Sequence, residues 1–175
     1  MISASLPKYV DARKIFLQRE QVSGRLEIGD LRRLRGLLAD DFGRVYVELR
    51  FFLNDSGKRV IKGKVTATFN VICQRCLEKL EILIGDEISL GVIESEDFAL
   101  GLDSSLDPWV CSDYKLSLLE LVEEQLILCL PIVNHHEDPD CVNSMDYQAN
   151  VNPKQGDSAK DSPFAVLRTL KTKSL

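Results

Sequence analysis

The chain has 175 residues, which is enough for one sizeable hydrophobic core and short for two. Hydrophobic residues make up 45% and charged residues 28%, as in ordinary globular domains, and the net charge of −5 argues against a general nucleic-acid binder. The charge is uneven, however, because residues 1–80 have a net charge of +7, residues 81–161 of −15 and residues 162–175 of +3. Such a split is a clue to nucleic-acid contact or to an acidic tail.

Short elements are predicted at the start of the chain. Residues 11–19 favour a short helix, and residues 24–28 alternate like a short strand. Asp30 can then cap a helix over residues 31–38, whose leucines fall on one helical face. The arginines of this helix lie largely on its other side.

Long strands are predicted next. Apolar and polar residues alternate over residues 45–53, a turn follows at Asn54-Asp55-Ser56-Gly57, and the alternation returns over residues 61–71. After Cys73-Gln74-Arg75-Cys76 it continues over residues 80–92. Three antiparallel strands joined by short turns are the natural arrangement.

The second half of the chain predicts one principal helix. Residues 94–108 form a loop, and residues 109–111 a short strand. Ser117 and Glu120 have the spacing of a capping box, which starts a helix over residues 118–130 that Pro131 ends.

These elements predict an α+β fold in which an antiparallel sheet of at least three strands packs with helices. Residues 1–133 form the single domain, and residues 134–161 a flexible polar linker. Residues 162–175 form a short amphipathic helix, because Ser162-Pro163 suits a helix start. This helix docks either on its own domain or on a partner.

A secretory signal is not expected, because the first residues lack a basic stretch followed by an apolar one. The longest apolar run, residues 126–133, is far shorter than the roughly 20 residues that span a bilayer. Five cysteines are an odd number, which disfavours a disulfide framework. We therefore expect a reduced, cytoplasmic protein with no membrane partner.

Cys73 and Cys76 are the first group that could perform chemistry. Two thiolates at this spacing on a tight turn can bind one tetrahedral metal ion, and His136 with Cys141 would complete a Cys₃His zinc site. Two alternatives stay open, namely unligated thiols on loops and a redox CxxC pair, although the βαβ context of redox motifs is missing. The neighbouring histidines 135 and 136 have no nucleophile positioned beside them, which disfavours a catalytic pair.

Basic residues are the second such group. Lysine and arginine beside threonine and asparagine suit contact with phosphate and sugar oxygens, whereas an ordinary charged surface is the alternative. The predicted face has few aromatic residues, so base stacking has weak support. The residues in this group are Arg32, Arg33, Arg35, Lys62, Lys64 and Arg75.

Several of these motifs, taken in order, resemble the YceD family of large ribosomal RNA subunit accumulation proteins. The most specific are the Cys73-Gln74-Arg75-Cys76 turn and the terminal Pro163-Phe164-Ala165-Val166-Leu167 segment. An early Leu6-Pro7, the acidic helix that runs into Leu130-Pro131, and the pair of His136 and Cys141 also match. The resemblance spans nearly the whole chain.

The resemblance implies a bacterial factor for the synthesis, processing or stability of large-subunit (23S) ribosomal RNA, with no known catalytic activity. We expect a non-enzymatic ribosome-biogenesis protein whose candidate partners are ribosomal RNA or a large-subunit precursor, and a ribosomal protein. The alternative is a protein–protein adaptor that recruits a ribosomal protein or a nuclease and affects RNA indirectly. A metal-dependent ribonuclease is less favoured, because the carboxylates are dispersed.

Overall fold

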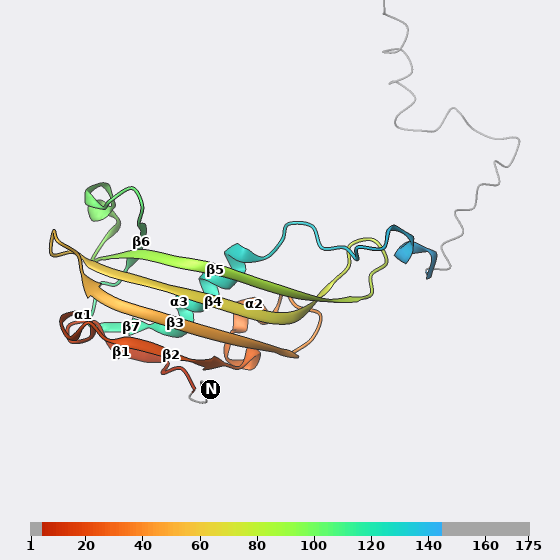
Figure 1. The fold of residues 1–175 in the computed structure, drawn as a ribbon, viewed down its shortest axis with the longest axis horizontal. Helices are drawn as coiled ribbons and strands as arrows, with labels where there is room; N and C mark the ends of the chain where they lie inside the picture. Colours follow the sequence, from red (N-terminus) through yellow and green to blue (C-terminus); the bar gives the residue numbers. More distant parts are fainter. Residues whose placement is uncertain (1–4, 145–175) are drawn as a thin grey trace, which may run out of the picture. The chain divides into compact units, whose positions relative to one another are not determined.

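The computed structural model describes residues 5–144 (Figure 1). The chain divides into two compact units, Met1–Val142 and Asn143–Leu175, and the description below concerns the first. The predicted helix over residues 162–175 and much of the predicted linker lie outside the described residues. The elements are β1 (Tyr9–Asp11), α1 (Ile15–Gln18), β2 (Gln21–Leu26), η1 (Ile28–Asp30), α2 (Arg32–Arg35), β3 (Gly43–Leu53), β4 (Arg59–Ile72), β5 (Lys79–Ile93), η2 (Glu96–Gly101), β6 (Asp107–Val110), β7 (Lys115–Ser117), α3 (Leu118–Cys129) and η3 (Pro139–Ser144).

A five-stranded sheet with the order β2-β3-β4-β5-β6 is the main element of the first unit. Strands β2 to β5 pair antiparallel, and the short β6 pairs parallel to β5. The three long strands predicted from alternation are β3, β4 and β5, so the predicted α+β fold is confirmed. The turn between β3 and β4 forms because the Asn54 side chain accepts hydrogen bonds from the backbone N–H groups of Ser56 and Lys58.

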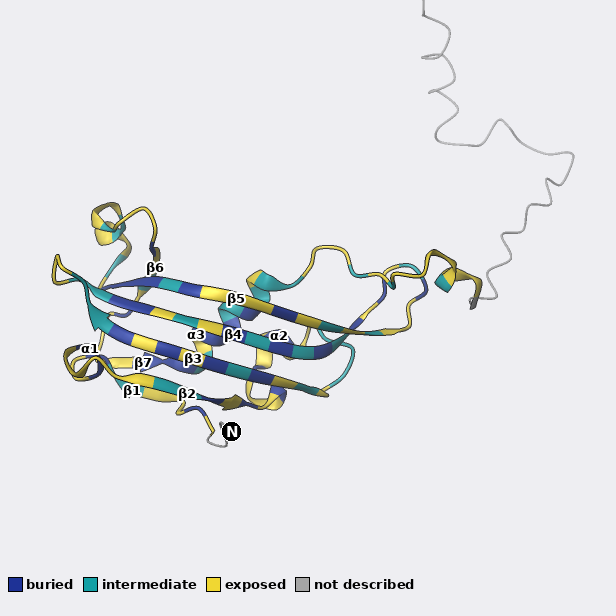
Figure 2. Cartoon of the chain, viewed as in Figure 1, coloured by how far each residue is buried: buried dark blue, intermediate teal, exposed yellow. Residues whose placement is uncertain are grey.

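The sheet has one buried face and one open face. Along β3 the side chains of Val45, Val47, Leu49 and Phe51 are buried, whereas the residues between them are partly or fully exposed (Figure 2). Helix α1 contacts β3, and its Phe16 ring meets Phe51 edge-on with the ring centroids 5.6 Å apart. Helix α3 contacts β4 and β5. In Figure 2 no helix of residues 5–144 crosses the opposite face, which we call the open face.

Helix α3 begins at the predicted capping box. The Ser117 hydroxyl accepts a hydrogen bond from the Glu120 backbone N–H at 3.3 Å, which satisfies one of the unpaired donors of the first turn. Leu121, Val122 and Leu126 are buried in the core, because residues three to four apart share one helical face. The helix ends at Cys129, close to the predicted end.

Both predicted N-terminal helices are shorter in the structure. Tyr9–Asp11 pairs as β1, so α1 retains one turn. The second predicted helix is reduced to α2, because η1 precedes it and Ala39 already donates a backbone hydrogen bond to Asn70 of β4.

Asp30 does not cap α2 as predicted. The buried Glu123 carboxylate of α3 takes this role, and accepts backbone N–H hydrogen bonds from Arg33 at 2.7 Å and Leu34 at 3.3 Å. A residue distant in the sequence therefore supplies the acceptor that a local cap would otherwise provide.

The shorter predicted elements are present with shifted bounds. Strand β2 begins at Gln21, before the predicted residues 24–28, and pairs with β3 over its full length. The predicted loop over residues 94–108 contains η2 and the start of β6. The parallel pairing of β6 places Trp109 opposite Val92.

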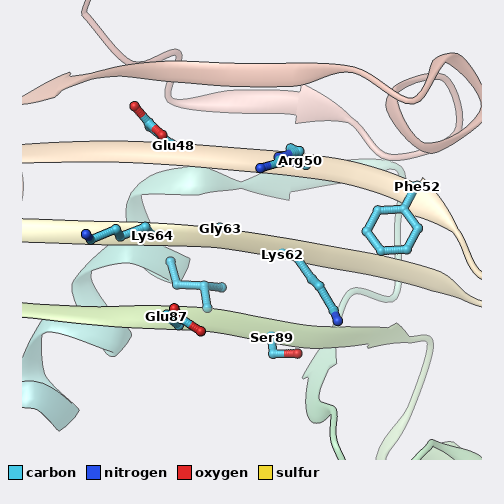
Figure 3. A pocket seen from close by; sticks show the side chains of 9 residues that line it. Glu48, Arg50, Phe52, Lys62, Gly63, Lys64, Glu87 and Ser89 are labelled. Atoms are coloured by element: carbon cyan, nitrogen blue, oxygen red, sulfur yellow. The ribbon is translucent and has the colours of Figure 1, made fainter.

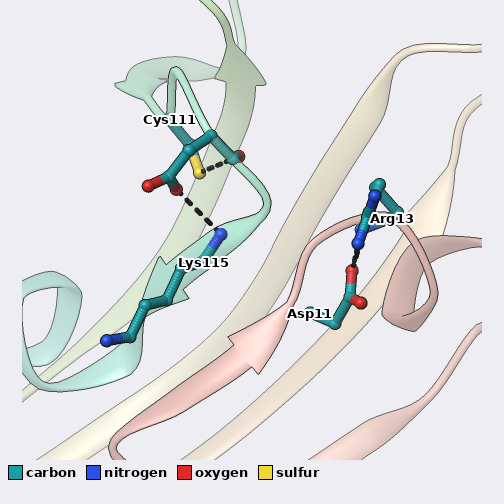
Figure 4. A network of polar contacts seen from close by, with 5 residues as sticks. Asp11, Arg13, Cys111 and Lys115 are labelled. Atoms are coloured by element: carbon teal, nitrogen blue, oxygen red, sulfur yellow. Dashed lines mark hydrogen bonds and ion pairs between the residues drawn. The ribbon is translucent and has the colours of Figure 1, made fainter.

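A small second sheet closes one side of the core, with β1 antiparallel to β7. Figure 4 shows the turn that leads into β7, where the Cys111 thiol donates to the Asp113 carbonyl at 3.2 Å and the Lys115 backbone N–H donates to the Asp113 carboxylate at 2.8 Å. Arg13 contacts Asp11 beyond the end of β1. The two contacts to Asp113 organise the turn into β7, and Cys111 is not part of a disulfide.

Candidate functional site

The Cys73-Gln74-Arg75-Cys76 turn joins β4 to β5. The Cys73 backbone N–H donates to the Glu78 carbonyl at 2.9 Å, and the Leu77 N–H donates to the Cys73 carbonyl at 2.9 Å. Leu77 adopts a φ of 62°, a left-handed conformation that few residues other than glycine adopt. The tight turn places both cysteine side chains in buried positions.

The segment after α3 lies against this turn. The Gln74 backbone N–H donates to the Asn134 carbonyl at 2.8 Å. The Arg75 guanidinium donates to the carbonyls of His136 and Asp138. The predicted linker covers residues 134–161, and contacts group its first residues, 134–142, with the first unit. Arg75 therefore fastens the segment that bears His136 to the turn that bears the cysteines.

Cys73, Cys76, His136 and Cys141 form one cluster, with one ligand atom from each residue within 4.8 Å of all the others. Two sulfur ligands of a tetrahedral zinc ion, each about 2.3 Å from the metal, lie about 3.8 Å apart. The cluster is thus compact enough to bind a metal ion, and its members are the four residues predicted from the sequence.

The His136 ring has the orientation of a metal ligand. Its Nδ1 lies 3.3 Å from the Cys76 sulfur, while its Nε2 lies 3.3 Å from the Lys79 carbonyl. When Nε2–H donates to that carbonyl, the Nδ1 lone pair faces the sulfurs. This is the second hydrogen bond that commonly orients metal-binding histidines.

The thiols in the cluster differ in acidity. Burial raises the pKa of Cys73, but hydrogen bonds from backbone N–H groups, chiefly those of Cys76 and Arg75, outweigh burial and lower it to about 5. Burial and the neighbouring Cys76 raise the pKa of Cys141 to about 11. None of the five cysteines, all of which lie within residues 5–144, is in a disulfide. The lowered pKa of Cys73 favours its thiolate, the form that binds metal.

The predicted RNA-contacting residues do not share one surface. Lys62 and Lys64 lie on the open face of β4. The arginines of α2 lie beside α3 instead, where Arg33 forms an ion pair with Glu124 at 2.6 Å and Arg35 pairs with Asp41. Arg32 lines a separate hollow beside α3, and Arg75 lies in the cysteine turn.

Sequence reasoning missed most of the open face around the two lysines. A hollow of about 530 Å³ lies there, lined by Arg50 and Phe52 of β3 and by Glu87 and Ser89 of β5 (Figure 3). The same alternation that predicted β3 could have found Arg50 and Phe52, because every second residue of a strand shares a face.

Comparisons with known proteins agree with these features. Residues 61–171, which include the four clustered residues, match the family model described as "Large ribosomal RNA subunit accumulation protein YceD". The chain belongs to the YceD family. A family member from Haemophilus influenzae, with the same description, is 30% identical over 175 residues, which are 99% of this chain and 100% of that relative. No solved structure matches this YceD-family chain. Within residues 5–144 no helix is long and apolar enough to cross a membrane.

Proposed function

We propose that this protein is a non-enzymatic cytoplasmic factor that supports the synthesis, processing or stability of 23S ribosomal RNA by binding that RNA, or a large-subunit precursor, directly. One observation carries the proposal. Lys62 and Lys64 lie on the open face, and neither forms an ion pair with any residue of 5–144. The name of the family and of the Haemophilus influenzae relative supports the same process.

The charge of the open face suits a polyanion. On β2, β3 and β4 it has a single acidic side chain, Glu48, among the basic residues, and β5 adds Glu87 opposite Lys64 and Glu81 opposite Asn70. Lysine and arginine that neutralise phosphates release counterions, which supplies most of the sequence-independent affinity for RNA. The basic residues are Arg25, Arg44, Arg50, Lys62 and Lys64.

Charge reversal tests the proposal. We expect the Lys62→Glu/Lys64→Glu variant to bind a 23S ribosomal RNA transcript at least tenfold more weakly than the unchanged protein in filter binding at fixed salt. The slope of log affinity against log salt should fall by about 1 for each lost phosphate contact.

Lys14→Glu/Lys115→Glu is the matched control, because it changes the net charge equally at residues just before α1 and on β7. This control variant should bind the 23S ribosomal RNA transcript with an affinity within about twofold of that of the unchanged protein. Equal binding by both variants would remove the open face from the interface. A protein that binds no ribosomal RNA, yet captures a ribosomal protein after ribonuclease treatment, would instead be the adaptor.

We further propose that Cys73, Cys76, His136 and Cys141 bind one structural zinc ion. Four ligands leave no open coordination position, which is typical of structural rather than catalytic zinc sites. The bound ion would cross-link the β4–β5 turn to residues 134–142, which otherwise interact through a few hydrogen bonds.

Metal analysis tests this proposal. Protein purified without chelator should contain about one zinc per chain, and Cys76→Ser should contain far less. Cys111→Ser is the matched control, because this buried cysteine lies outside the cluster. Zinc well below one equivalent in the unchanged protein would contradict the site.

A further inference from the structure

Strand β3 presents a regular series of basic and aromatic side chains on the open face. Arg44, Tyr46, Glu48, Arg50 and Phe52 are alternate residues of this strand, and the residues between them are buried. Successive side chains on one face of a strand lie about 6.6 Å apart. The series therefore follows a line along the face rather than a single point.

The aromatic rings of this series are available to a ligand. Tyr46 and Phe52 are each partly exposed, and neither belongs to the hydrophobic core. The Arg25 guanidinium lies over the Tyr46 ring, 5.1 Å from its centroid, so this ring already stacks with one planar cationic group. Phe42, just before β3, is 70% exposed.

Two hollows lie along this line. The larger, about 530 Å³, places Phe52 beside Arg50 and Lys62, with Glu48 and Lys64 toward its other end (Figure 3). The smaller, about 270 Å³, is lined by residues that include Arg25, Phe42, Arg44 and Tyr46. The larger hollow is within the range of small-molecule sites, about 300–1,000 Å³.

We propose that the open face binds unpaired RNA, with one base stacked on Phe52 and another on Tyr46; this inference rests on the proposed function. Arg50 and Lys62 are placed to contact the phosphates beside the first base. The Glu48 carboxylate, which has no ion pair within residues 5–144, is placed to accept hydrogen bonds from base amino groups.

Unpaired RNA fits this surface better than a duplex does. In a duplex the bases are stacked on each other, so their faces cannot reach a protein ring, whereas single strands expose them. Phe52 lies six residues after Tyr46, so the two rings are about 20 Å apart along the strand. A bound segment must therefore span several nucleotides.

Fluorescence anisotropy with a labelled 12-nucleotide RNA, single-stranded or annealed to its complement, tests this inference. We expect the single strand to bind at least tenfold more tightly than the duplex at equal salt. Phe52→Leu and Tyr46→Leu should each weaken single-strand binding by about 5- to 150-fold, the usual effect of removing one stacked base. Phe52→Tyr should retain binding, and Phe98→Leu, which changes an exposed ring on η2, should have no effect.

A second measurement uses only the unchanged protein. Ultraviolet crosslinking to oligouridine, followed by peptide mapping, should place the adducts within residues 42–52, and adducts confined to other segments would overturn the inference. Stacking is wrong if the single strand and the duplex bind with equal affinity and the two leucine variants keep full affinity for RNA. The proposed function still stands in that case if Lys62→Glu/Lys64→Glu loses affinity for RNA. If no form of RNA binds, or only an acidic protein binds this face, both proposals fail.

Discussion

Gly63 of β4 lies opposite Leu49 of β3, and there is no room between the two strands for a side chain. A Cβ atom on Gly63 would lie 2.1 Å from the Glu48 carbonyl oxygen and 2.8 Å from a methyl carbon of Leu49. The Glu48 carbonyl belongs to the backbone of β3 and cannot turn aside. The close approach of the strands beneath the lysines of the open face thus requires glycine.

We predict that Gly63→Ala lowers the free energy of unfolding by about 2–3 kcal/mol, as overpacking against a fixed backbone does. Urea denaturation measures the change. Gly29→Ala is the control, because a Cβ there would have no neighbour within 4 Å, and its effect should stay within about 0.5 kcal/mol. Equal stability of both variants would show that β3 and β4 can move apart to make room for the added Cβ atom with little loss of free energy of unfolding.

Helices α2 and α3 are joined through one buried carboxylate. Glu123 is only 8% exposed, yet no basic side chain forms an ion pair with it among the described residues. Its hydrogen bonds come from backbone N–H groups at the start of α2, which otherwise have no helical acceptor. A one-turn helix is marginal alone, so α2 depends on this contact.

We predict that Glu123→Ala lowers the free energy of unfolding by about 1–3 kcal/mol, because hydrogen bonds to a charged group are lost. The free energy of unfolding of Glu123→Gln should lie between those of Glu123→Ala and the unchanged protein, since the amide oxygen can still accept hydrogen bonds. The matched change Glu124→Ala removes only an exposed ion pair with Arg33 and should cost about 1 kcal/mol or less. Urea denaturation of the three variants in parallel gives the order of their free energies of unfolding. A larger decrease of this free energy for Glu124→Ala than for Glu123→Ala would contradict the role of Glu123.

The observed lengths of the strands and helices show which of them local sequence patterns can predict. Alternation predicted β3, β4 and β5 well, because each strand buries every second side chain against one core. The leucines of residues 31–38 also match a helical face, yet only one turn of α-helix forms there. Packing against α3 and pairing of Ala39 with Asn70 override that pattern, and neither contact is visible locally.

At the scale of the whole molecule, the uneven charge of the sequence does not produce two separate surfaces. The basic helix α2 lies beside the acidic α3, and Arg33 pairs with Glu124 across 91 positions of sequence. Part of the basic charge is thereby neutralised. The open face of β2, β3 and β4 keeps an excess of basic over acidic side chains, because the acidic side chains of α3 lie with α3 behind the sheet, and Glu87 of β5 lies opposite Lys64.

The metal cluster also depends on the whole fold. The Cys73-Gln74-Arg75-Cys76 spacing predicts a pair of ligands on a turn, because that geometry is local. His136 and Cys141 are some 60 residues away, and they reach the turn because α3 runs along the sheet and the chain then leaves it beside the end of β4.

The amino-acid pattern was sufficient for the strands, the capped helix α3 and the ligand pair of Cys73 and Cys76, because periodicity, capping and the spacing of that pair act over short stretches of chain. The sequence also named His136 and Cys141, but only the tertiary fold brings them to the pair. Tertiary packing decided which basic residues stay unpaired and which aromatic rings line the open face. These outcomes depend on contacts between residues far apart in sequence, such as Glu123 with α2 and Arg75 with the segment after α3.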